Sequence, residues 1–226
     1  MKLRTTAIAV LAVAFLTISA LVLFGGDREV DGGAADSSPV ADTSTRIEGT
    51  ETAVLAGGCF WGVEAVFERL NGVIDVRSGY SGGLAETATY AQVAYAKRTN
   101  HAESVEIVFD PEVIGYEVLL DVFFAVAHDP TQLNRQGPDV GRHYRSVIFF
   151  SNEEQRSVAE SKIEALDQSR VYSRPIVTVL EPLDAFYVAE DYHQDYVKHN
   201  PRQTYVVYWD LPKIEHLEQA FPDLLK

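Results

Sequence analysis

The chain's one cysteine, Cys59, lies in Gly57-Gly58-Cys59-Phe60-Trp61-Gly62 and is the first candidate for chemistry. The apolar run over residues 52–56 predicts a buried strand before it, and apolar residues recur at helical spacing after it. Cys59 is therefore expected at a helix N-terminus, where unpaired backbone N–H groups and the helix dipole favour the thiolate. The neighbouring glycines are expected to leave the sulfur uncovered. This pattern favours a nucleophilic cysteine with a lowered pKa over a buried structural cysteine.

Glu103, in His101-Ala102-Glu103, is the second candidate. The alternation over residues 101–109 predicts a strand and places Glu103 on the same face as His101 and Val105. A carboxylate that points into a core is costly unless it is paired or protonated, so its pKa should be raised. The sequence thus predicts an acid that can donate a proton.

Two loops carry further polar and aromatic side chains. Gly79-Tyr80-Ser81-Gly82-Gly83 predicts a flexible turn that leads to Tyr90. Residues 128–146, which include Asp139 and Tyr144, predict a long loop that is dense in hydrogen-bonding side chains. Loops of this length in compact domains are usually functional or disordered, and we interpret both loops as parts of a site.

The elements that must position these residues alternate along the chain. Further strands are expected over residues 73–78, 146–150 and 177–180, and helices over 116–127, from a capping box Ser151-Asn152-Glu153-Glu154 to about 169, and near 189–198. This mixture predicts an α/β or α+β layer fold in which the glycine-rich segments form site loops.

The N-terminus carries an export pattern. Lys2 and Arg4 precede an apolar stretch over residues 7–24. The stretch reaches the lower limit for a bilayer span, which favours an uncleaved anchor over a cleaved signal. Residues 27–49 lack aromatic side chains and predict a flexible acidic linker. We therefore expect an export signal or membrane anchor over 1–26, a linker over 27–49 and one folded domain over 50–226, located in the periplasm or on the extracytoplasmic face of a bacterial membrane.

Composition narrows the choice of partners. The formal net charge of −14 argues against nucleic acid. The six histidines show no metal-ligand spacing, so no metal site is expected. Beyond Met1, the only sulfur atom is that of Cys59, which suits a protein that works among oxidants.

Several motifs together resemble those of the A-class peptide methionine sulfoxide reductases, over residues 52 to about 210. The motifs occur in the family's order and spacing: Gly-Cys-Phe-Trp-Gly, Gly-Tyr-Ser-Gly-Gly, His-Ala-Glu, Asn-Arg-Gln-Gly-Pro-Asp-Val-Gly, Tyr-Arg-Ser and Ala-Glu-Asp-Tyr-His-Gln. The resemblance implies a mixed central sheet with packed helices, an α/β (α+β) two-layer sandwich with a ferredoxin-like core. It also implies repair of oxidative damage by reduction of the S epimer of methionine sulfoxide, in proteins and as the free amino acid.

The resemblance further implies roles for seven residues. The nucleophile falls on Cys59, the acid on Glu103, the donors to the sulfoxide oxygen on Tyr90 and Tyr144, the pocket for the S-methyl group on Phe60 and Trp61, and a polar loop carboxylate on Asp139. Cys59 would attack the sulfoxide sulfur and become a sulfenic acid as methionine leaves.

The absence of a second cysteine bears on the reductant that the resemblance implies. Many members carry further cysteines in a C-terminal tail that resolve the sulfenic acid as a disulfide, and this chain has none. It resembles a single-cysteine member that needs an external reductant, namely a thioredoxin-like or glutaredoxin-like protein or a small thiol. No bound cofactor is implied. We expect a monomer that meets oxidised proteins, free methionine sulfoxide and, if the N-terminal segment is uncleaved, a membrane.

A serine hydrolase is one alternative. Gly79-Tyr80-Ser81-Gly82-Gly83 matches the G-x-S-x-G nucleophile elbow, with Ser81 as nucleophile, and Asp129 and His193 follow in hydrolase order. However, residues 84–95 lack the amphipathic helix that an elbow enters.

A non-catalytic, membrane-tethered binding module is the other alternative. In that case Cys59 and Glu103 would be ordinary packing residues, and Cys59 would titrate like a model thiol.

Overall fold

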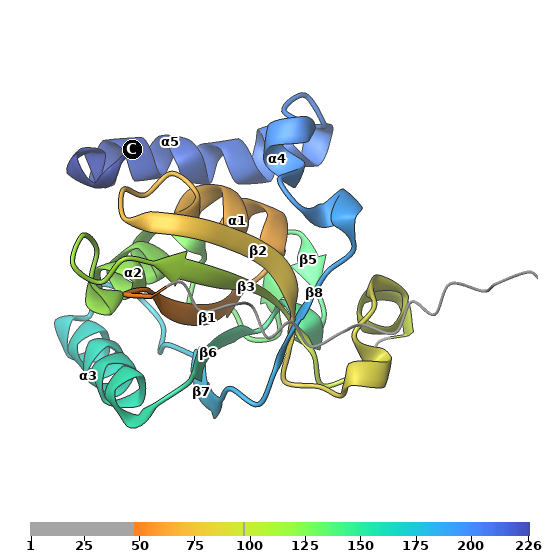
Figure 1. Ribbon diagram of the computed structural model, residues 1–226, viewed down its shortest axis with the longest axis horizontal. Coiled ribbons are helices and arrows are strands. Elements are labelled where there is room, and N and C mark those ends of the chain that lie inside the picture. Colours follow the sequence, from red (N-terminus) through yellow and green to blue (C-terminus); the bar gives the residue numbers. More distant parts are fainter. Residues whose placement is uncertain (1–47, 97) are drawn as a thin grey trace, which may run out of the picture. The chain divides into compact units, whose positions relative to one another are not determined.

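The computed structural model describes residues 48–96 and 98–226 (Figure 1). The expected export segment over 1–26 and nearly all of the expected linker over 27–49 lie outside the described residues. In the described part of the chain, no helix combines the length and the apolar character that a membrane span requires.

A curled six-stranded sheet in the order β7-β6-β1-β3-β2-β8 forms the centre of the domain (Figure 1). Neighbouring strands are antiparallel except β6 and β7, which are parallel. The strands are β1 (Glu51–Gly57), β2 (Val73–Ser81), β3 (Ala102–Phe109), β6 (Ser146–Phe150), β7 (Val179–Pro182) and β8 (Phe186–Val188). A mixed sheet with packed helices confirms the predicted fold class.

The larger hydrophobic core lies between the sheet and three helices. These helices are α1 (Phe60–Phe67), α2 (Tyr116–Val122), which continues as the π-helical turn Phe123–Ala127, and α3 (Glu153–Ser169). On β1, Ala53 and Leu55 join this core, whereas Val54 and Ala56 join a smaller apolar cluster. β1 is therefore buried on both faces, which explains why its sequence is a continuous apolar run.

The C-terminal segment forms a further layer against α1. Its helices are α4 (Tyr196–His199) and α5 (Leu211–Ala220), which follows the π-helical turn Val206–Asp210. Val197, Val206 and Ile214 pack with Ala65 of α1, so α1 lies between the sheet and α5 (Figure 1). α1 is thereby covered on both sides.

The expected flexible turn at residues 79–83 is wrong for its first three residues. Gly79, Tyr80 and Ser81 are the end of β2, where Tyr80 is opposite Glu103 of β3 and Tyr187 of β8. Pairing with β3 on one side and β8 on the other fixes these three residues, although Gly79 suggested a flexible turn. The chain turns only at Gly82, where φ is +87°.

The expected long loop over 128–146 also contains more structure than its sequence suggested. It holds a short hairpin of β4 (Arg135–Gln136) and β5 (Asp139–Val140), then a 3-10 turn, Arg142–Tyr144. Strands of two residues leave no alternation for a pattern to detect, which is why the sequence did not reveal them.

Two helix boundaries differ from expectation. The helix expected near 189–198 is interrupted, because Asp195 adopts a left-handed conformation with φ of +51° between the 3-10 turn Asp191–His193 and α4. The cap of α3 lies one residue later than expected, since the side chain of Asn152 accepts from Gln155 N at 2.8 Å.

Candidate active site

The seven residues that the sequence singles out line one cavity of about 190 Å³. They are Cys59, Phe60, Trp61, Tyr90, Glu103, Asp139 and Tyr144, and they come from the start of α1, from β3 and from the two loops. Segments far apart in sequence thus converge on the point where β1 passes into α1.

Cys59 occupies the N-cap position of α1, as predicted. Gly58 before it has φ of +97°, and a Cβ at this glycine would lie 2.6 Å from Cβ of Gln136. Glycine is therefore required both for the turn and for the close approach of the β4–β5 hairpin. Because the hairpin covers the turn, Cys59 is only 8% exposed, and the expectation of an uncovered sulfur is wrong.

The pKa of the Cys59 thiol is raised well above its ordinary value, contrary to the prediction. Burial is the largest cause, and the charges of Glu103 and Asp210 act in the same direction. The backbone N–H of Trp61 opposes them but does not prevail. A helix terminus contributes only a partial charge, whereas burial penalises the whole charge of a thiolate. The resting cysteine is therefore a neutral thiol.

Glu103 lies in the cavity as a protonated acid. It is 1% exposed, and its Oε2 accepts a hydrogen bond from Phe60 N at 3.2 Å. Burial raises its pKa to about 8, helped by the nearby charge of Asp139 and opposed by the Phe60 N–H. The prediction of an inward glutamate with a raised pKa is confirmed, and the group is mostly neutral at pH 7.

Tyr90 and Tyr144 add two neutral hydrogen-bond donors to the cavity. Burial, followed by the charges of Glu103 and Cys59, raises the pKa of both phenols. The backbone N–H of Tyr90 donates to Glu190 Oε1 at 2.9 Å, and this hydrogen bond fixes the backbone at Tyr90. Both hydroxyls therefore remain protonated, and both residues line the cavity, where they can donate to the oxygen of a bound ligand.

Tyr205 also lines the cavity, and sequence reasoning missed it. Its hydroxyl donates to Asp139 Oδ2. Its ring meets the indole of Trp61 edge-on, with 5.9 Å between centroids. No motif or spacing distinguishes Tyr205 from the other tyrosines, so only the path of the chain before α5 identifies it. The Tyr205 side chain thus orients both the carboxylate of Asp139 and the indole of Trp61.

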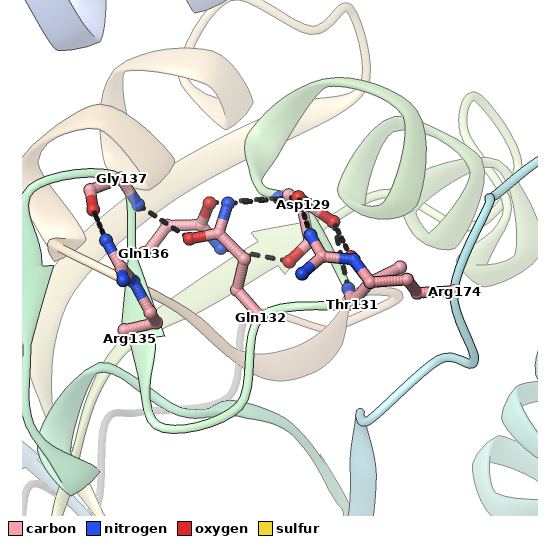
Figure 2. A network of polar contacts seen from close by, with 7 residues as sticks. All are labelled: Asp129, Thr131, Gln132, Arg135, Gln136, Gly137 and Arg174. Atoms are coloured by element: carbon pink, nitrogen blue, oxygen red, sulfur yellow. Dashed lines mark hydrogen bonds and ion pairs between the residues drawn. The ribbon is translucent and has the colours of Figure 1, made fainter.

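A hydrogen-bond network holds the loop that carries Asp139 (Figure 2). The carboxylate of Asp129 accepts from Thr131 N at 2.9 Å and from Gln132 Nε2 at 2.9 Å. The Gln136 side chain bonds both the backbone N–H and the backbone carbonyl of Asp129, at 3.2 and 3.1 Å. The loop is thus fixed by its own side chains, and it presents Asp139 to the cavity.

The residues of the hydrolase alternative do not come together as a triad. Ser81 is buried, and its Oγ donates to the carbonyl of Ala185 at 3.0 Å. His193 Nδ1 accepts from Trp61 instead, and Asp129 contacts Thr131 of its own loop and Arg174. Over residues 48–96 and 98–226, no three His, Cys, Asp or Glu side chains are arranged to hold a metal ion.

Comparisons with known proteins agree with this geometry. The family model described as "Peptide methionine sulfoxide reductase" matches residues 51–224. A peptide methionine sulfoxide reductase of a Synechocystis species is 53% identical over 191 residues, which cover 83% of this chain and 89% of that protein. One from Natronomonas pharaonis is 51% identical over 174 residues, 77% of this chain and 97% of that protein. The solved structure of methionine sulfoxide reductase A of Corynebacterium diphtheriae has a TM-score of 0.61 at 35% identity, covering 70% of this chain and 78% of that one. The chain therefore belongs to the peptide methionine sulfoxide reductase family, as an A-class member.

Proposed function

We propose that the protein reduces the S epimer of methionine sulfoxide, in proteins and as the free amino acid, through a sulfenic acid on Cys59. The observation that carries this proposal is the presence of a cysteine thiol, a protonated glutamic acid and two neutral phenols in one small cavity. The choice of the S epimer follows the A-class resemblance.

The proton balance of the first step follows from the neutral resting site. Hydrogen bonds from Glu103, Tyr90 and Tyr144 to the sulfoxide oxygen make the sulfur electrophilic. Cys59 Sγ attacks that sulfur, Glu103 gives its proton to the oxygen, and the thiol proton returns to the Glu103 carboxylate. The sulfur–oxygen bond breaks as the hydroxyl moves to Sγ. Methionine leaves reduced by two electrons, and Cys59 remains as the sulfenic acid.

Phe60 and Trp61 are suited to bind the S-methyl group, which all the proposed substrates share. Phe60 and Trp61 line the cavity beside Cys59, and their rings suit the S-methyl group. This group is the apolar part common to free and peptide-bound methionine sulfoxide. The same pocket therefore serves both substrate forms.

The second half of the cycle requires a thiol from outside the chain. One external thiol attacks the Cys59 sulfenic acid, releases water and forms a mixed disulfide, and a second thiol then frees Cys59. A thioredoxin-like or glutaredoxin-like protein supplies both thiols in one molecule, whereas a small thiol supplies them in two steps.

Without reductant, we expect a burst of one methionine per chain and then no turnover. Cys59 is the only thiol, so the sulfenic acid has no partner within the chain. Rapid mixing with free methionine sulfoxide measures the burst, and a sulfenic-acid probe should label the stalled enzyme. Adding dithiothreitol should restart turnover. A burst of two methionines per chain would contradict the single sulfenic acid.

We expect the single-turnover rate of methionine formation to fall as pH rises through about 8, because Glu103 loses its proton near that pH. Glu103 donates only below its pKa, so the loss lies on the alkaline side. The pH profile of single-turnover methionine formation measures this without interference from the reductant. If the rate instead rose steadily to pH 10, ionisation of Cys59 would limit the reaction, and the acid role of Glu103 would be refuted.

We also propose that the domain is exported and works outside the cytoplasm. The support is the pattern of Lys2, Arg4 and the apolar residues 7–24. Fractionation of cells with alkaline extraction of the membranes separates the alternatives, because an anchor stays in the membrane and a cleaved form is released. Recovery of the intact chain from the cytoplasm would refute export.

A further inference from the structure

The carboxyl group of Glu190 connects two segments that lie far apart in the sequence. Glu190 follows β8 in the motif Ala-Glu-Asp-Tyr-His-Gln, is partly buried and does not line the cavity. Its Oε1 accepts from the backbone N–H of Tyr90 at 2.9 Å, across 100 residues of sequence. Its Oε2 accepts from the hydroxyl of Tyr80 at 2.9 Å. Tyr90 lines the cavity and Tyr80 belongs to β2, so one side chain joins a cavity residue to the central sheet.

The sheet fixes the hydroxyl group that donates to Glu190. Tyr80 is fully buried and is paired on both sides, with β3 and with β8. Burial, followed by the charge of Glu190, raises the pKa of the Tyr80 phenol, so the hydroxyl keeps its proton and remains a donor. The backbone next to Glu190 is fixed as well, because Ala189 N donates to Ser78 O of β2 at 2.9 Å. Glu190 is therefore held through both its backbone and its side chain.

Tyr90, by contrast, depends on Glu190 for a partner of its backbone N–H. It begins a short helical segment that continues as the π-helical turn Ala91–Ala96. The first N–H groups of a helix have no carbonyl partner inside that helix. A nearby backbone bond, from Val93 N to Thr89 O at 2.9 Å, stays within the segment. The bond from Tyr90 N to Glu190 instead reaches a residue that is fixed to the sheet, so it ties the segment to the sheet at the residue that enters the cavity.

We propose that Glu190 is a positioning residue for the reductase reaction, which sets the place of the Tyr90 hydroxyl by accepting the Tyr90 N–H. A tyrosine side chain is rigid apart from its rotamer torsions, so a displaced backbone displaces the hydroxyl. The hydrogen bond from that hydroxyl to the sulfoxide oxygen would weaken as its length and angle depart from their preferred values. The inference rests on the proposed role of Tyr90 as a donor to the sulfoxide oxygen.

Two variants of Glu190 separate the acceptor from the packing. In Glu190→Gln, the amide oxygen can replace Oε1, and the amide N–H can donate to the Tyr80 oxygen. Glu190→Leu has a side chain of similar bulk but no acceptor. Each variant is made in the unsubstituted chain, in Tyr90→Phe and in Tyr144→Phe. Because both phenols are proposed to donate to one oxygen, the contribution of Tyr90 is measured most clearly when the Tyr144 hydroxyl is absent.

We expect Glu190→Leu to lower the single-turnover rate of the Tyr144→Phe chain roughly three- to tenfold, the range that one hydrogen bond contributes. In the Tyr90→Phe chain, the same change should lower the rate by less than about twofold, because the hydroxyl that Glu190 positions is already missing. The half-saturating concentration of methionine sulfoxide should change less than the rate, since the phenol acts mainly in the transition state. Glu190→Gln should restore the rate. Equal losses in the two backgrounds, or an equal loss in Glu190→Gln, would overturn the inference.

Amide hydrogen exchange supplies a readout that does not depend on turnover. The Tyr90 N–H should exchange roughly three- to tenfold faster in Glu190→Leu than in the unsubstituted chain, and Glu190→Gln should restore its protection. Unchanged exchange in Glu190→Leu would overturn the inference even if the rate fell. Thermal unfolding checks that each variant is folded. The burst of the unsubstituted chain tests the proposed function separately, because the exchange result reports the bond between Tyr90 and Glu190 whether or not methionine is formed.

Discussion

Cys59→Ser is expected to lower the rate of methionine formation by about four orders of magnitude or more. A serine hydroxyl is scarcely ionised at neutral pH and is a poor nucleophile at sulfur. The raised pKa of Cys59 does not weaken this expectation, because a thiol remains far easier to deprotonate than a hydroxyl when Glu103 accepts the proton. Single-turnover assays without reductant measure the loss. Activity within tenfold of the wild type, ~1.4 kcal/mol in transition-state free energy, would refute Cys59 as the nucleophile.

Ser81→Ala is the matched control for the cysteine variant. Ser81 is also buried near the end of a central strand, but its Oγ bonds only the Ala185 carbonyl. We expect methionine formation within about threefold of the wild type, since one neutral hydrogen bond away from the cavity is lost. A loss comparable with that of Cys59→Ser would instead mean that Ser81 is needed for the reduction, and the cysteine variant would no longer isolate the nucleophile.

Glu103→Gln is expected to lower kcat by roughly two to four orders of magnitude while the fold is retained. Glutamine matches the shape of the protonated acid and can still accept from Phe60 N, but it has no proton to transfer. Stability supplies an independent readout. A buried carboxyl with its pKa raised to about 8 stabilises the native state at low pH and loses that contribution as pH rises through 8. The variant should therefore unfold at a higher temperature than the wild type at pH 9.

Glu64→Gln is the control for this second variant. Glu64 is on α1, is 1% exposed, and burial raises its pKa to about 8, so it matches Glu103 in environment but does not line the cavity. We expect the same stability gain at pH 9 with kcat close to the wild type. If the two glutamine variants lost activity equally, the effect of Glu103→Gln would be structural, and the transferred proton would come from elsewhere.

The two cavity acids explain why the cysteine needs no lowered pKa. A thiolate beside the charged forms of Glu103 and Asp139 would bring several negative charges together in a buried site. Keeping the thiol and Glu103 neutral avoids that cost. A bound sulfoxide then receives a proton from neutral Glu103 and an electron pair from the sulfur of Cys59. The reactivity of Cys59 is thus a property of the cavity with substrate and not of the helix end alone.

The sequence by itself determined the elements and the residues whose chemistry is local. The apolar runs predicted β1, β3 and β6, and the inward position of Glu103 followed from strand alternation, because side-chain direction in a strand has a period of two. The seven site residues could be identified because their motifs are continuous short segments. Burial of a charge on a strand face can be deduced from neighbours two residues away, so the raised pKa of Glu103 was also predictable.

The tertiary structure alone decided the properties that depend on distant segments. The pKa of Cys59 was predicted in the wrong direction, because the hairpin over Gly58 and the carboxylate of Asp210 reach it from elsewhere in the chain. Tyr205 joins the cavity only through the packing of the C-terminal layer on α1, and His193 meets Trp61 across 132 residues. A local pattern reports the conformation of its own segment. Solvation, charge coupling and contact with remote side chains are set by what folds against that segment.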